Sequence, residues 1–115
     1  MKYYMLLFVI FVGIMPQIAR TQSVRRTITI TQLHPIAAVR PASPKHINLT
    51  RIYVNNGKWG NTDCRQDAAD LRKEDSHLMA ILLAAWLNSK SITIEVDSSL
   101  RPADTVCQVT ALFVK

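Results

Sequence analysis

The residue types that most often perform catalysis or bind metals occur in this chain, but their spacing does not form a recognisable site. The histidines His34, His46 and His77 lie too far apart in the sequence to supply the close-spaced ligand pair that is typical of zinc sites. Serine and aspartate also occur, yet no nucleophile-elbow motif is found. Glu74 and Asp75 mark a predicted helix start, where the helix dipole favours carboxylates. We therefore expect no enzymatic activity, no metal and no other cofactor.

The chain has two cysteines, Cys64 and Cys107. In an exported protein, a single pair of cysteines is typical of one disulfide. A bridge that closes a loop of this length stabilises a small domain by about 4 kcal/mol in the chain-entropy model. The alternative is a pair of buried free thiols. The N-terminal sequence favours the disulfide.

The N-terminal segment MKYYMLLFVIFVGIM has the pattern of an export signal. Lys2 gives it a basic start, and an apolar run follows over residues 3–15 until Pro16 ends it. This run is too short to cross a bilayer as a helix. The pattern therefore predicts a signal peptide and not a membrane span.

We predict a signal peptide over residues 1–23 and a single domain over residues 24–115. The expected protein is bacterial, is secreted or periplasmic, and has no stable membrane span after signal removal. The alternatives are cleavage after Ala19, an uncleaved N-terminal anchor and a buried N-terminal strand.

Alternating apolar and polar residues predict four strands, over 27–31, 47–54, 91–97 and 106–114. A proline-rich loop over 34–46 separates the first two strands. Within the second strand the apolar residues change face between Leu49 and Ile52, which predicts a bulge near Thr50–Arg51. A short return strand is expected at Lys58–Trp59.

Two helices are expected after this point. Asp63 and Gln66 have the spacing of a capping pair for a short helix over 64–71. Ser76 is the expected N-cap of a longer helix that runs to Asn88.

The longer helix is apolar on nearly every side. The sheet of so small a domain covers one flank, so the other flank needs a partner or projects as an exposed patch. We therefore predict that Ile81, Leu82 and Trp86 lie at an interface between copies of the chain in a homo-oligomer. The alternative is a central helix that its own domain wraps tightly.

The element order predicts an α+β, mainly β domain, an OB-fold-like five-stranded barrel with one helix between strands 3 and 4. Within this plan the run ITQLH (residues 30–34) resembles the first strand of the B subunits of subtilase-cytotoxin-type and typhoid-type pentameric toxins. Residues 78–96, a helix followed by SITIEVD, are similar to the helix-then-strand segment of that family. The resemblance covers most of the mature chain as a pattern and is close over ITQLH.

This resemblance implies a secreted OB-fold subunit that forms a ring, binds sialylated or related glycans and associates with a catalytic A subunit. In that family part of the glycan site is a serine just upstream of the first strand. Arg26 stands near the matching position here, so that site is not carried over.

Charge is distributed unevenly along the chain. Residues 24–62 contain six basic residues and no acidic residue, whereas residues 63–115 contain six basic and eight acidic residues. A basic half attracts anionic glycans, lipid head groups or nucleic acid, and export argues against nucleic acid. A second hypothesis is therefore a monomeric periplasmic interaction or inhibitor protein that binds an acidic partner in the cell envelope. A solvated basic surface without a partner is the simplest alternative.

Three residues are predicted to contact a ligand. Trp59, in a Gly/Asn-rich loop, could stack on a sugar ring, and Tyr53 and Lys58 could hydrogen-bond to a ligand or attract an anionic group. The alternative for Trp59 is a core position at one end of the barrel.

Overall fold

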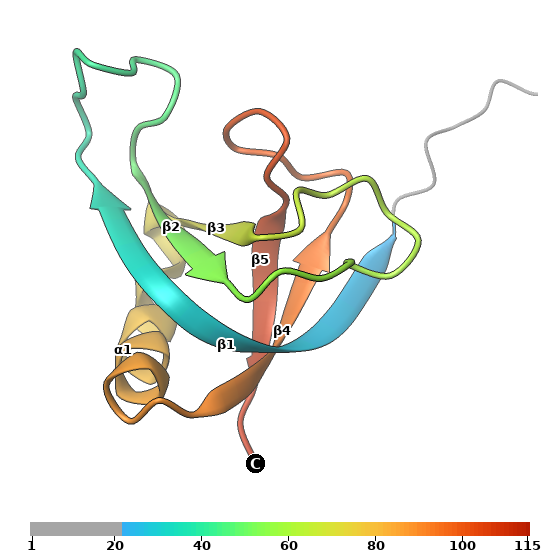
Figure 1. Ribbon diagram of the computed structural model, residues 1–115. Coiled ribbons are helices and arrows are strands. Elements are labelled where there is room, and N and C mark those ends of the chain that lie inside the picture. The colour runs from blue at the N-terminus through green and yellow to red at the C-terminus, as the bar shows by residue number, and fades with distance from the viewer. Residues whose placement is uncertain (1–21) are drawn as a thin grey trace, which may run out of the picture.

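The computed structural model describes residues 22–115, whose chain forms a strongly curved sheet with one helical segment beside it (Figure 1). The elements follow in this order: β1 (Ser23–Ile36), β2 (Leu49–Val54), β3 (Ala68–Arg72), the 3-10 helix η1 (Lys73–Leu78), α1 (Met79–Leu87), β4 (Ser91–Asp97) and β5 (Gln108–Phe113). The prediction of a mainly β domain with a helix between the third and fourth strands is confirmed.

The five strands close into a ring in the order β1-β2-β3-β5-β4. The long strand β1 makes this closure, because its first half pairs with β4 and its second half with β2. The register of the β1–β2 pair shifts between Ile30 and Gln32, and such a bulge bends a strand. The β3–β5 junction is parallel and has a single register pair, Asp70 with Gln108.

The core lies inside this ring. Inward-facing residues alternate along the strands, as the two-residue period of a strand requires, and Leu82 of α1 joins them. The fully buried members of this set include Ile28, Ile52, Ile94, Val96 and Val109.

The predicted disulfide between Cys64 and Cys107 is present, with the two Cα atoms 5.5 Å apart. It ties the segment before β3 to the residue before β5, next to the parallel junction that closes the ring. Free thiols are therefore excluded for this pair.

The first strand is longer than predicted and begins at Ser23, the residue before the predicted domain start. Ser23 donates its hydroxyl to Asp97, and Gln22 exchanges hydrogen bonds with Ser98. The first 21 residues of the predicted signal peptide lie outside the described residues.

Three local predictions between the second strand and the helix are wrong. Residues 64–71 form a loop and β3 instead of a helix, because the disulfide, a backbone bond from Arg65 to Thr105 and pairing with β2 hold them extended. Lys58–Trp59 lies in an irregular loop and not in a strand. No register shift occurs near Thr50–Arg51, since Leu49 and Ile52 are buried on opposite faces of a strand that is covered on both sides.

The helical segment begins at Lys73, earlier than predicted, and its first part is a 3-10 helix. Ser76 lies inside η1 and no side chain caps α1, so the predicted N-cap is wrong. Strand β4 matches the predicted strand over 91–97, and β5 begins two residues later than predicted.

Candidate binding site

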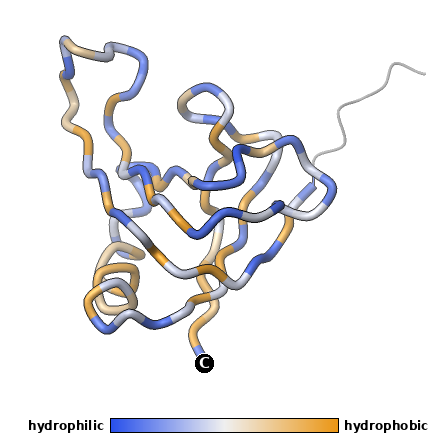
Figure 2. The backbone as a smooth tube through the Cα atoms, in the orientation of Figure 1, coloured by the Kyte–Doolittle hydropathy of each residue, from blue (hydrophilic) through white to orange (hydrophobic). Residues whose placement is uncertain are grey.

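Helix α1 is hydrophobic along its whole length (Figure 2), yet several of its large side chains remain partly exposed. Leu82 is its one fully buried residue and packs into the core. Of the three predicted interface residues, Leu82 is therefore enclosed within its own chain. Ile81 and Trp86 keep 38% and 40% of their surface exposed.

An α-helix has 3.6 residues per turn, so each residue of α1 has a defined angular position around the helix axis relative to the inward-facing Leu82. These positions fall into two flanks. One flank, here called the open flank, carries Leu83, Trp86 and Leu87, all exposed. The other, here called the groove flank, carries Ile81 and Ala84 and borders a pocket. The exposed part of α1 therefore has two separate apolar surfaces.

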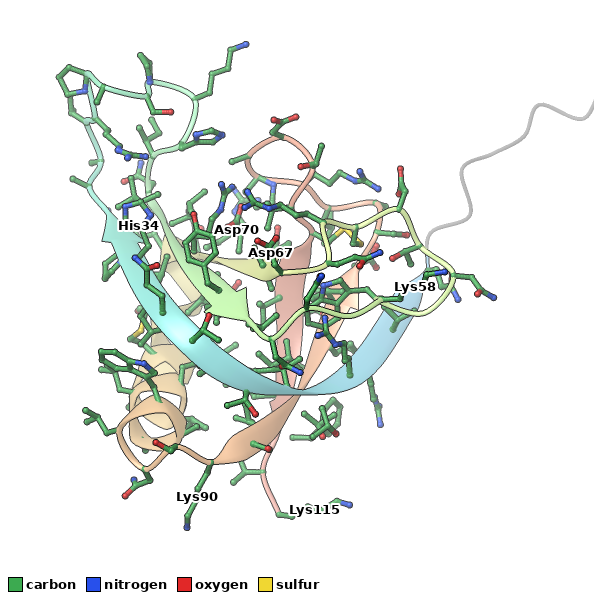
Figure 3. All side chains as sticks on the ribbon, in the orientation of Figure 1. His34, Lys58, Asp67, Asp70, Lys90 and Lys115 are labelled. Carbon is green, nitrogen blue, oxygen red and sulfur yellow. A yellow bond between two sulfur atoms is a disulfide. The ribbon has the colours of Figure 1, made fainter. Side chains whose placement is uncertain are left out.

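A cluster of side chains surrounds the predicted ligand residue Tyr53 on the outer face of β1 and β2. Figure 3 labels His34 and Asp67, which belong to it. Tyr53 is half-buried and lies opposite Gln32 of β1. The ring of His34 stacks on that of Tyr53, with the centroids 6.5 Å apart and the planes 18° from parallel. The guanidinium of Arg65 lies over the Tyr53 ring, 5.7 Å from its centroid.

Arg65 is held in place by Asp67, to which it donates two hydrogen bonds of 2.6 and 3.2 Å. This contact raises the pKa of the Arg65 guanidinium and lowers the pKa of the Asp67 carboxyl. Arg65 and Asp67 were missed in the sequence, although their spacing, Arg-x-Asp directly after a cysteine, was the available signal. Together with Tyr53 and His34 they form what we call the Tyr53 cluster.

Trp59 does not present its ring at the surface, because only 1% of the residue is exposed. Its indole N–H donates a 3.0 Å hydrogen bond to the backbone oxygen of Arg65, and the Arg26 guanidinium lies 4.9 Å above its ring. Trp59 is thus a core residue that fixes the segment leading into the Tyr53 cluster.

Lys58 is exposed on the loop between β2 and β3, and Figure 3 shows it well away from His34. The structure therefore does not bring the three predicted ligand residues to one surface. Arg26 crosses the base of the same loop and donates hydrogen bonds to the backbone oxygens of Asn55, Gly57 and Gln66.

Beside the Tyr53 cluster, on the same face of β2, lies a buried ion pair between Arg51 and Asp70. Arg51 donates to both carboxylate oxygens, at 2.9 and 3.0 Å, and to the backbone oxygen of Ala103 at 3.3 Å. Asp70 is fully buried, and this burial raises its pKa while the bonds from Arg51 oppose the shift. The pair connects β2, β3 and the β4–β5 loop, so it stabilises the part of the domain that carries the Tyr53 cluster.

Several residues of the basic half make contacts inside the molecule. Arg25 pairs with Glu95 and lies 3.9 Å above the centroid of the Phe113 ring. Arg26 donates hydrogen bonds to backbone oxygens, and Arg51 is paired with Asp70. The basic half is therefore not a continuous field of unpaired positive charge.

One serine–histidine contact has the residue types of a catalytic pair. The Ser43 hydroxyl lies 2.7 Å from Nδ1 of His46, three residues further along the same loop. Asp70 is fully engaged by Arg51, and within residues 22–115 no carboxylate hydrogen-bonds to His46. The contact therefore lacks the third group that orients the base in a catalytic triad.

Across residues 22–115 no group of three or more His, Cys, Asp or Glu side chains is placed to hold a metal ion. No helix in this part of the chain is both long and apolar enough to cross a membrane. The chain matches no protein-family model, and neither a curated protein nor a solved structure is significantly similar to it.

Proposed function

We propose that this chain is an exported, non-catalytic binding module that assembles with copies of itself through the open flank of α1 and binds a glycan at the Tyr53 cluster. The observation that carries the proposal is the exposed apolar surface of α1. Exposed apolar patches on small domains mark interaction sites. Leu87 alone keeps 73% of its surface exposed, and Leu83 and Trp86 lie beside it on the helix.

A second copy is the partner that best suits this flank. Burying a large apolar side chain contributes about 1.5–3 kcal/mol, and the open flank presents three of them, Leu83 on one turn and Trp86 and Leu87 on the next. Homo-oligomers have more apolar interfaces than transient complexes do. The toxin B subunits that the sequence resembles form rings, and a catalytic A subunit as a further partner belongs to the same proposal.

The strand order supports an OB-fold for this domain. A five-stranded ring with β3 beside β5, and a helix between β3 and β4, follows that plan. OB-folds bind oligosaccharides and oligonucleotides on the face of strands 2 and 3 and on the adjoining loops. Tyr53 and Asp70 belong to these two strands, and Ala103 to the β4–β5 loop beside them.

A saccharide suits this face better than a nucleic acid. Nucleic-acid binding needs cations that neutralise phosphates, whereas Arg51 and Arg65 are each paired with a carboxylate. The half-buried Tyr53 and the polar groups beside it suit the apolar faces and hydroxyl groups of a sugar. The export pattern of the N-terminus supports the same choice.

The assembly is tested by light scattering on the purified mature protein. We expect a mass that is a multiple of the protomer mass, and a shift to monomer for Leu83→Glu/Leu87→Glu. Val39→Glu is the matched control, because Val39 is about as exposed as Leu87 but lies on the β1–β2 loop. A monomeric unmodified protein at micromolar concentration would overturn the assembly.

The ligand is tested on a glycan array that includes sialylated glycans. We expect binding that Tyr53→Ala abolishes and Lys58→Ala leaves unchanged, since Lys58 lies away from the cluster. Binding that is lost in Lys58→Ala and kept in Tyr53→Ala would place the site elsewhere.

A further inference from the structure

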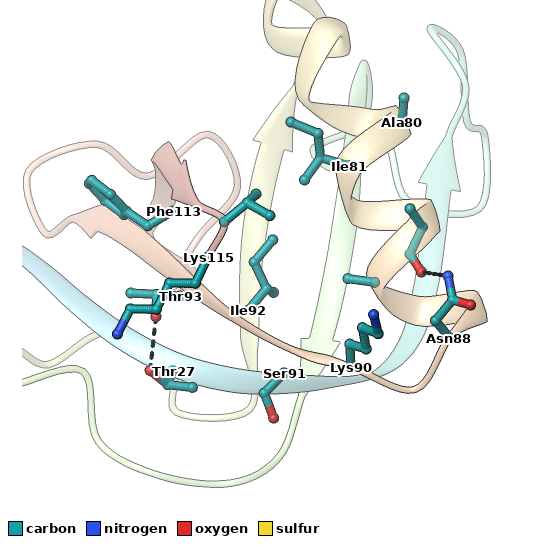
Figure 4. Close-up of a pocket in the computed structure, with 13 residues that line it drawn as sticks. Thr27, Ala80, Ile81, Asn88, Lys90, Ser91, Ile92, Thr93, Phe113 and Lys115 are labelled. Carbon is teal, nitrogen blue, oxygen red and sulfur yellow. Dashed lines mark hydrogen bonds between the residues drawn. The ribbon is translucent and has the colours of Figure 1, made fainter.

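The groove flank of α1 forms one wall of a pocket of about 720 Å³, and strands β4 and β5 form the opposite wall (Figure 4). Figure 4 shows Ile81 and Ile92 projecting into this space from opposite walls. Ala80, Ala84 and Ala85 keep the helix wall thin, and Phe113 borders the other side. The volume lies within the range of about 300–1,000 Å³ that is usual for small-molecule sites.

The polar groups that line this pocket are mostly engaged with one another. The Thr27 and Thr93 hydroxyls are 2.9 Å apart, and the Ser91 hydroxyl lies 3.4 Å from that of Thr29. Asn88 donates its side-chain amide to the backbone oxygen of Ala84 at 2.7 Å. Each of these polar groups therefore has at least one partner within the protein.

The charged side chains that line the pocket are of one sign. Lys90 and Lys115 line it, and no acidic residue does so in the part of the chain that the structure describes. Neither lysine forms an ion pair within residues 22–115. Figure 4 shows Lys90 extending into the space between the end of α1 and β4. A ligand with one negative charge and an apolar body would complement both features.

We propose that this pocket binds a long-chain fatty acid, with its carboxylate at Lys90 and its acyl chain between Ile81 and Ile92. The apolar side chains of the two walls offer the acyl chain dispersion contacts. A sugar suits this pocket less well, because the lining is mainly apolar and a sugar would bury hydroxyl groups against it. Lys115 adds a second positive charge at the rim.

The site is separate from the surfaces of the proposed function. The open flank points away from the groove, and the Tyr53 cluster lies on the outer face of β1 and β2. Fatty-acid binding is therefore independent of oligomer formation and of glycan binding.

The test uses the intact purified protein and a fluorescent probe, a dansyl-labelled undecanoic acid. We expect saturable binding of one probe per chain, displaced by palmitate, and displaced at least about tenfold less effectively by the uncharged hexadecanol. Lys90→Glu should weaken probe binding by at least about tenfold, since a charge-assisted contact is replaced by repulsion. Ala84→Phe should abolish binding by filling the groove.

Ala37→Phe is the matched control, because it makes the same substitution at an exposed position of the β1–β2 loop, outside the groove and outside the open flank of α1. Circular dichroism and the elution volume in size-exclusion chromatography report whether each variant is folded. Lys90 is exposed, so Lys90→Glu still tests the proposal if Ala84→Phe is misfolded. Probe binding that is unchanged in both groove variants, or equal displacement by palmitate and hexadecanol, would overturn the proposal. Binding to anionic phospholipid vesicles alone, without uptake of the free acid, would also overturn it.

Discussion

The indole of Trp59 donates a hydrogen bond of 3.0 Å to the backbone oxygen of Arg65, so a core residue fixes the position of a surface guanidinium. Arg65 in turn lies over the ring of Tyr53 and is held by Asp67. The geometry of the Tyr53 cluster thus depends on a residue that a ligand does not touch.

Trp59→Phe should therefore affect both stability and the cluster. The variant leaves the Arg65 oxygen without its donor, and we expect a loss of about 1–2 kcal/mol in the free energy of unfolding. Urea unfolding measures this loss, and a glycan titration should show weaker binding because Arg65 is no longer fixed. Lys58→Ala, an exposed change in the same loop, should alter stability by less than about 0.5 kcal/mol. Equal effects of the two variants would contradict the positioning role.

The disulfide should contribute a large share of the stability of this small domain. Replacing both cysteines in Cys64→Ser/Cys107→Ser releases a loop with a sequence separation of 43 residues. The chain-entropy model predicts a loss of about 4 kcal/mol. Chemical unfolding with and without a reducing agent measures it. The double variant itself should be insensitive to the reducing agent, and a wild-type protein that is also insensitive would contradict the prediction.

Two features of the sequence carry enough information to predict a strand and a disulfide. Strand β4 was predicted with its observed bounds because Ile92, Ile94 and Val96 alternate with polar residues and the strand has one face toward the core. The disulfide followed from composition and the N-terminal segment. The alternation in β4 is a local pattern. The disulfide prediction depends only on the number of cysteines and on the export pattern.

The predictions that are wrong concern segments in which long-range contacts override the local preference for helix, strand or bulge. The spacing of Asp63 and Gln66 fits a helix cap, yet the Cys64 disulfide and the pairing of β3 with β2 hold that segment extended. Leu49 and Ile52 suggested a bulge because the sequence does not reveal that β2 is buried on both faces. Likewise, no local pattern places Arg65 over Tyr53.

The buried pair Arg51–Asp70 gives a prediction that separates charge from packing. Asp70→Asn leaves the buried Arg51 without its counter-charge, and we expect a loss of about 3–5 kcal/mol. The double variant Arg51→Met/Asp70→Leu removes both charges and should recover most of that loss. Urea unfolding of the three proteins measures the difference. A double variant that is less stable than Asp70→Asn would show that the ion pair itself is stabilising.

Asp97 gives a pH dependence whose sign follows from its hydrogen bonds. Its carboxylate accepts bonds from the hydroxyl and backbone N–H of Ser99, at 2.6 and 2.8 Å, and from the hydroxyl of Ser23, and these bonds lower its pKa below 3.8. Asp97 therefore contributes stability above pH 3.8 that is lost as the pH falls through its folded-state pKa. NMR titration should give a midpoint below 3.8 that rises in Ser99→Ala. An unchanged midpoint in that variant would contradict the assignment.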